Sequence, residues 1–167
     1  MKIALKAPMA QLVPASGATG MPGRGGDPKR ANDYRRMAGI EAQKSNALIE
    51  AEEHFAKALE NLSSLSGIEG LRDQRAELLL LIGAVQMPLH GFTSRQVHQT
   101  YSECYNLLSG STDLFKRFDA TWGLWLNRCI AGELGHAEQL TRELEKIAED
   151  SGSHGNKLQA HHAVWTS

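Results

Sequence analysis

Apolar side chains recur every three or four residues along most of the chain after residue 30, which places them on one face of an α-helix. The same spacing predicts helices over 31–45, 45–67, 71–87, 94–110, 111–133 and 136–152, and the start of another over 153–167. In the most regular of these, 45–67, the apolar stripe consists of Ala51, Phe55, Ala58, Leu59 and Leu62. No segment has the alternation typical of strands, so we expect an all-α fold.

Short polar or glycine-containing breaks separate the predicted helices and define antiparallel hairpins. The residues expected to form turns, cap helices or end them are, in chain order, Ser45, Asn46, Pro88, Thr93 or Ser94, Ser111 or Thr112, Gly132, Gly135 and Gly152. The pattern therefore predicts three stacked helix hairpins followed by the first helix of a fourth.

The first thirty residues have a different composition. Lys6 and Pro8 interrupt the only apolar stretch, which is too short for a secretory signal. Segment 13–30 is rich in glycine and proline, but a phosphate-binding loop needs a lysine followed by a hydroxyl residue at a set place after its glycines, and no lysine stands there. We expect a disordered leader over 1–30 and a repeat domain over 31–167.

Composition narrows the classes of function. Eighteen Lys and Arg residues oppose nineteen Asp and Glu residues, for a net charge of −1, so no nucleic acid or anionic membrane partner is expected. Cys104 and Cys129 lie within helical patterns and are predicted to be free, small apolar side chains, which favours a cytoplasmic protein. The longest apolar run, 78–85, falls far short of the ~20 residues of a membrane-spanning helix.

The segment EAEEHFAKAL, 50–59, resembles the second helix of a tetratricopeptide repeat (TPR). Ala51, Phe55 and Ala58 match its small, aromatic and small positions, and Gly39 stands twelve residues before Ala51.

Two later units match this pattern less well. The second does so through Gly83, Val97, Tyr101 and Cys104. The third keeps Leu124, Gly132 and Ala137 but has Trp125 where a small residue is usual, which puts the helix packing there in doubt. The second-helix anchors at 51, 97 and 137 are 46 and 40 residues apart, longer than the simple repeat.

The strings AELLLLIGAVQM, DATWGLWLNRCIAGELGHAEQL and LQAHHAVWTS resemble the TPR-like region of large bacterial ATPase and nucleotide-cyclase signalling proteins and of related ATP-dependent transcriptional activators. The resemblance covers 31–167. It implies either a non-catalytic scaffold for protein–protein interaction or a regulatory repeat segment of such a multidomain enzyme. Because neither the ATPase nor the cyclase part is present in this sequence, none of their functional residues can be transferred to it.

Candidate chemistry is sparse. His154, His161 and His162 could suggest a metal site, but adjacent helical histidines point about 100° apart and no HExxH pattern is present. The sequence also lacks a GxSxG nucleophile elbow. We therefore expect no enzymatic activity, no metal and no cofactor.

The remaining expectation is a binding surface formed by the first helices of the hairpins. With the register above, a concave groove would present Arg36, Gln43, Glu77, Trp122 and Leu126 to a protein or peptide partner.

The C-terminal segment LQAHHAVWTS reads as a helix without the second helix that should cover Leu158 and Trp165. The chain is therefore interpreted as a fragment of a repeat array or the product of a shortened gene. This end is expected either to self-associate or to fray.

Overall fold

The structure is a computed structural model that describes residues 28–63 and 70–166, and over these residues it consists of helices without a strand. The all-α prediction is confirmed. The helices are α1 (Pro28–Lys44), α2 (Leu48–Ser63), α3 (Leu71–His90), α4 (Arg95–Leu108), α5 (Leu114–Ile130), α6 (Leu134–Ser151) and α7 (His154–Thr166).

Most of the predicted leader, residues 1–27, lies outside the described residues. Its last three residues, 28–30, belong to α1. Pro28 is compatible with the first turn of a helix because the amide hydrogen that proline lacks has no intrahelical partner there.

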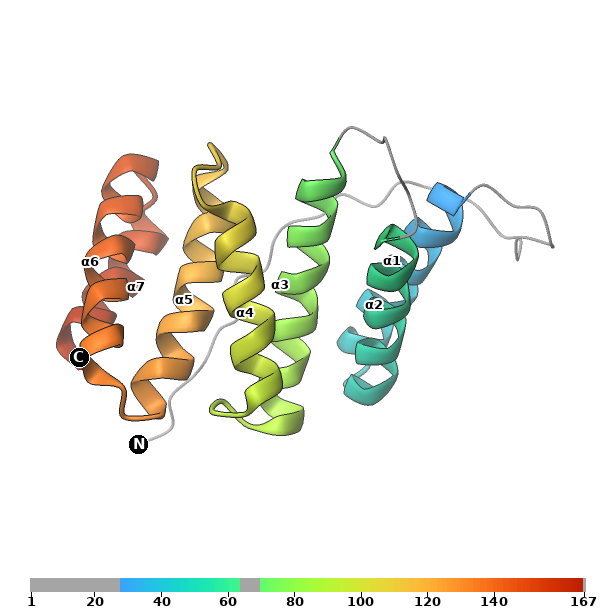
Figure 1. Cartoon of the computed structure of the whole chain (residues 1–167), viewed down its shortest axis with the longest axis horizontal. Helices are drawn as coiled ribbons and strands as arrows, with labels where there is room; N and C mark the ends of the chain where they lie inside the picture. Colours follow the sequence, from blue (N-terminus) through green and yellow to red (C-terminus); the bar gives the residue numbers. More distant parts are fainter. Residues whose placement is uncertain (1–27, 64–69, 167) are drawn as a thin grey trace.

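Each helix packs against the next one along the chain, so that the helices form a row of two layers (Figure 1). In the layer of odd-numbered helices, an ion pair between Arg36 and Glu77 joins α1 to α3, and α3 also touches α5. In the even-numbered layer, the Tyr105 hydroxyl of α4 donates a hydrogen bond to Glu143 of α6 at 2.6 Å.

Helix α3 continues past Pro88 to His90, so the prediction that Pro88 ends the helix is wrong. Proline cannot donate to the carbonyl four residues earlier, but in the last turn this omits only one hydrogen bond. Gly91 ends the helix at φ 87°, and its N–H donates to the Met87 carbonyl at 3.1 Å.

The predicted caps are partly confirmed. Ser94 caps α4, because its side chain accepts a hydrogen bond from the Val97 N–H at 3.3 Å. For α5 the cap is Asp113, whose carboxylate accepts from the Lys116 N–H at 3.0 Å, so the choice of Ser111 or Thr112 is wrong. An aspartate at this position has the additional advantage of a negative charge beside the positive end of the helix dipole.

Three turns depend on residues that tolerate a positive φ. Asn46 has φ 60° in the turn before Leu48; it forms the turn but does not cap α2. Gly152 ends α6 at φ 64°, as predicted. Gly132 has φ 78° in the α5–α6 turn, whereas Gly135, also expected to flank that turn, lies inside α6.

The first hairpin closes around a contact between a glycine and an aromatic ring. A β-carbon on Gly39 of α1 would lie 2.5 Å from Cε1 of Phe55 of α2, which is inside van der Waals contact. Phe55 is fully buried between the two helices, as the TPR-like pattern predicts. The absence of a side chain at Gly39 thus allows the ring to lie directly on the α1 backbone.

A second ring, that of Tyr101 in α4, lies against two helices at once. A β-carbon on Gly83 of α3 would lie 2.6 Å from Cε2 of this ring, and a β-carbon on Gly123 of α5 would lie 2.0 Å from Cε1. These atoms are on opposite edges of the ring, so Tyr101 links the second hairpin internally and joins it to α5.

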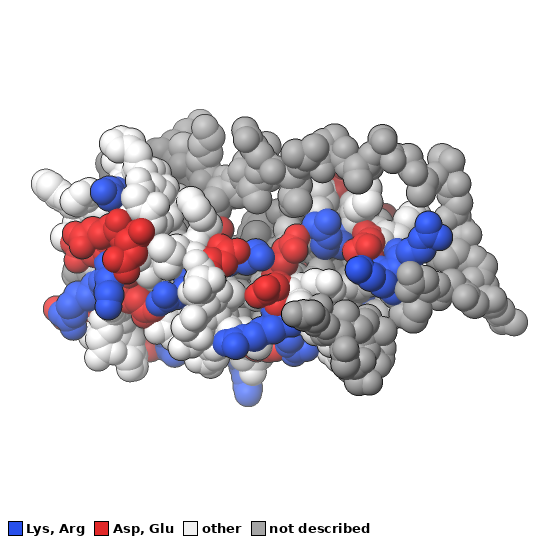
Figure 2. All heavy atoms as spheres, turned by 90° about the horizontal axis from the view of Figure 1, so that it is seen from above, with Lys and Arg blue, Asp and Glu red and all other residues white. Residues whose placement is uncertain are grey.

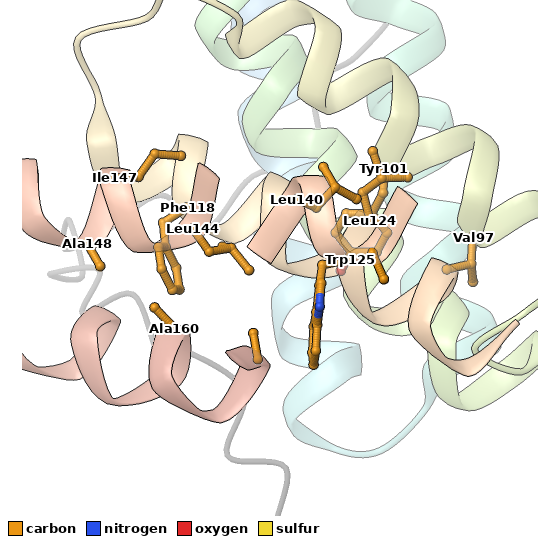
Figure 3. Packing of buried hydrophobic residues seen from close by; sticks show 12 residues of the cluster. Val97, Tyr101, Phe118, Leu124, Trp125, Leu140, Leu144, Ile147, Ala148 and Ala160 are labelled. Carbon is orange, nitrogen blue, oxygen red and sulfur yellow. The ribbon is translucent and has the colours of Figure 1, made fainter. Parts of the chain in front are cut away.

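The largest buried cluster lies in the C-terminal half of the row, where α4, α5, α6 and α7 meet. Figure 3 shows Phe118 of α5 pointing toward Leu144 of α6 and Ala160 of α7. Trp125 of α5 is only 2% exposed and belongs to the same cluster. The third unit therefore accommodates a tryptophan where the repeat pattern has a small residue.

We predict that Gly123→Ala destabilises the fold by about 1–3 kcal/mol despite alanine's better helix propensity, because the new methyl group would overlap the Tyr101 ring. Gly135→Ala is the matched control: it lies in α6, and no other atom comes within 4 Å of the place its methyl group would take, so it should be neutral or slightly stabilising. Urea unfolding of both variants measures the difference, and equal stabilities would contradict the proposed overlap.

Phe55→Ala should lower the free energy of unfolding by about 3–5 kcal/mol, the usual range for removing a buried aromatic ring. Ile49→Ala, on the same helix but 68% exposed, provides the control. A loss below about 1 kcal/mol for Phe55→Ala would show that α1 and α2 are not held together by this ring.

Candidate partner-binding surface

The five residues predicted to line a groove lie on odd-numbered helices: Arg36 and Gln43 on α1, Glu77 on α3, and Trp122 and Leu126 on α5. All five are partly buried. They are therefore accessible in part.

The structure brings Arg36 and Glu77 together, with 2.8 Å between Nη1 and Oε1. Each of these side chains is about one-third exposed or less, and the pair links α1 to α3. The two charges are thus partnered with each other, and such a pair contributes little net stability at a surface. No hydrogen bond among the described residues joins the Gln43 side chain to either of them.

Trp122 lies at the boundary between core and surface. Its ring centroid is 4.7 Å from that of Trp125, and 6.3 Å from those of Phe118 and of His162. Trp125 is buried while Trp122 is partly exposed, so one of the two tryptophans belongs to the core and the other reaches the surface. Leu126, one turn further along α5, packs at the edge of the same cluster.

Charged side chains are mixed over the face shown in Figure 2. Basic and acidic groups alternate along the row of helices, and neither sign forms a continuous field across this face. Several of the charges are paired between helices, among them Arg75 of α3 with Glu103 of α4, and Arg117 of α5 with Glu143 of α6. The surface pattern agrees with the balanced charge of the sequence.

Asp119 of α5 is a charged group that the sequence pattern did not single out. Burial, and then the neighbouring Asp113 carboxylate, raise the pKa of Asp119 to about 7. Asp119 in turn contributes, after burial, to raising the pKa of Tyr101 and of Cys104 on α4. In the sequence, Asp119 stands between the apolar residues Phe118 and Ala120, and this is the local signal that could have drawn attention to Asp119.

Both cysteines are free, as predicted. Cys104 is buried, its thiol donates to the Ala76 carbonyl at 3.5 Å, and burial is the main cause that raises its pKa to about 12. Cys129 is partly exposed near the end of α5, with its Sγ 3.7 Å from the Thr166 carbonyl oxygen of α7.

The histidines considered for a metal site, His154, His161 and His162, are all exposed on α7. Within residues 28–63 and 70–166, no three His, Cys, Asp or Glu side chains come close enough together to hold a metal ion. No helix in the same part of the chain has the length and apolar character needed to cross a bilayer.

Comparisons with known proteins do not assign the chain to a family. No family model matches it, and no curated protein or solved structure does either.

The pKa of Asp119 predicts a pH-dependent stability. Because its folded-state pKa of about 7 lies above the ordinary 3.8, the folded chain retains a proton that the unfolded chain releases between these values. The stability associated with the neutral carboxyl group is therefore complete below about pH 4 and is lost as the pH rises through 7.

Asp119→Asn should remove this dependence, because asparagine does not ionise. We expect the variant to be more stable than the parent by about 2–4 kcal/mol at pH 8 and to match it near pH 4. Urea unfolding at several pH values measures the difference in unfolding free energy between parent and variant. The other titrating groups are common to both proteins, so their contributions cancel in this difference. A parent-to-variant difference that does not change with pH would contradict the assignment.

Proposed function

We propose that this chain is a non-catalytic, TPR-like helical-repeat scaffold that binds a protein or peptide partner along the layer formed by α1, α3, α5 and α7. The observation that carries the proposal is the recurring contact of a first-helix glycine with a second-helix aromatic ring, Gly39 with Phe55 and Gly83 with Tyr101. Two hairpins therefore have the same glycine–aromatic contact between their first and second helices, as the units of a repeat array do.

Contacts between successive odd-numbered helices support the choice of this layer. Arg36 and Glu77 connect α1 with α3, and Trp122 and His162 connect α5 with α7. A layer of adjoining first helices is the surface that stacked hairpins commonly use for extended ligands.

Aromatic contact is the recognition mode that these side chains favour. The paired charges of Arg36 and Glu77 largely satisfy each other, whereas Trp122 combines a large apolar surface with partial exposure. Buried tryptophans are among the residues that most often dominate interface energies. The free thiols of Cys104 and Cys129 are compatible with a reducing compartment, and we place the protein in the cytoplasm.

A test uses peptides selected from a displayed random library against the immobilised full chain. We expect Trp122→Ala to weaken the selected peptides by about thirtyfold or more, because it removes the aromatic anchor. Phe115→Ala is the control, since Phe115 is on the same helix and 60% exposed. Circular dichroism of the variants establishes that each remains folded.

Peptides that bind Trp122→Ala as well as the parent, but lose affinity when the exposed Glu53 on α2 is changed to alanine, would place the binding surface on the opposite layer.

A further inference from the structure

Helix α7 repeats the packing of α5 at a distance of forty residues. Ala120 and Gly123 of α5 are buried, and Gly123 packs against α4, the helix before it. Their counterparts forty residues later are Ala160 and Ala163, which are likewise buried in the cluster that α7 shares with α5 and α6. In both helices, therefore, small residues at these two positions pack against the hairpin that precedes the helix.

The opposite face of α7 differs from that of α5 in being uncovered. Phe118 and Trp125 of α5 are buried in the cluster formed with α6 and α7. Their counterparts on α7 are Leu158, 69% exposed, and Trp165, 87% exposed. Helix α7 therefore presents the face that in α5 carries buried side chains, with one tryptophan at the equivalent place.

A groove next to this face marks where a covering helix would lie. It has a volume of about 450 Å³ and runs between α6 and the last turn of α7, with Leu134, Thr141, Glu145 and Val164 among its lining residues. Leu134 and Val164, 54% and 44% exposed, give the groove apolar side chains on both helices, beside the ion pair of Glu138 with Arg142.

Two polar positions define the chemistry of the occupant. Where α6 lies across α4 and α5, Glu143 accepts a hydrogen bond from the Tyr105 hydroxyl and pairs with Arg117 at 3.5 Å. Forty residues later, Glu145 stands in the place of Tyr105 and Lys157 in the place of Arg117. A side chain placed as Glu143 is would therefore face a lysine and a carboxylate. It would have to accept a hydrogen bond from the lysine and donate one to the carboxylate.

An amide side chain meets both demands, because its carbonyl oxygen accepts and its NH₂ group donates. We propose that the end of the row formed by α6 and α7 binds a partner helix antiparallel to α7. The helix is amphipathic, with an apolar stripe on Leu158, Val164 and Trp165 and a glutamine or asparagine between Lys157 and Glu145.

A second copy of this chain fits the site less well. Its α7 is the helix that could offer a matching apolar face, and α7 contains Lys157 and three histidines but no Asp or Glu. Pairing two such helices would bring their basic side chains together with no acidic side chain on either α7 to offset them.

The test uses a synthetic peptide with the sequence of residues 134–151 and the substitution Glu143→Gln, titrated calorimetrically into the full chain. We expect it to bind, and to bind several-fold more tightly than the peptide with the unchanged α6 sequence, because only the amide satisfies both Lys157 and Glu145. Trp165→Ser in the protein should weaken binding by about thirtyfold or more.

Phe115→Ser is the matched control, because Phe115 is an exposed aromatic residue on α5, and it should leave the affinity unchanged. Absence of binding at about 1 mM peptide, or equal affinity for the Trp165→Ser protein, would overturn the site. If the peptides with and without Glu143→Gln bound equally tightly, the proposal that the partner contributes an amide side chain would be overturned. Sedimentation that shows a dimer abolished by Trp165→Ser would identify a second copy as the occupant and overturn the partner helix.

Discussion

The packing of the Tyr101 ring between two helix backbones is the constraint on which the arrangement of this molecule depends. The axes of packed helices lie about 8–10 Å apart when ordinary side chains separate them. An aromatic ring fits between α3, α4 and α5 only because Gly83 and Gly123 have no side chain at the two places where its edges meet the backbone. The ring therefore fixes the spacing of three helices at once, and the contact between α3 and α5 follows from it.

Polar interactions also join neighbouring hairpins. The Gln86 side chain of α3 donates to Glu52 of α2 at 2.9 Å and accepts from Thr100 of α4 at 2.8 Å. Because Gln86 is buried, both bonds are made where an unsatisfied amide would be costly. One side chain thus connects two hairpins, much as Tyr101 does on the apolar side.

The sequence predicted the class, most helix bounds and the burial of Phe55, since these depend on local periodicity and on a small-to-aromatic spacing within one hairpin. It did not reveal the importance of Gly123, because the third unit was aligned through Leu124 and Trp125, and the glycine contacts the preceding hairpin instead of its own partner. The pairing of Arg36 with Glu77 was equally inaccessible, because it joins residues 41 apart and depends on how α1 lies on α3. Pro88 and Asp113 show how local rules compete: a proline is tolerated in a last turn, and of several possible caps the one directly before the first helical residue is used.

Of the candidate surface, periodicity could place Trp122 and Leu126 on α5 but could not determine how far α7 covers them. The contact of Trp122 with His162 depends on the position of a helix forty residues away, which a single-sequence pattern does not specify. The raised pKa of Asp119 could not be predicted from the sequence pattern either. It depends on how far the surrounding helices exclude water from the carboxyl group.

The two free thiols give the molecule a pair of internal reporters with different thresholds. Alkylation requires the thiolate, and the Cys104 thiol, enclosed beside the Ala76 carbonyl with its pKa raised to about 12, can react only when α3 separates from α4. Cys129 is already partly exposed near the end of α5, beside the Thr166 carbonyl in the last turn of α7, so its thiol is accessible without separation of α3 from α4. Labelling of Cys104 therefore reports opening of the interior, and Cys129 serves as the accessible reference thiol in the same sample, without an added probe.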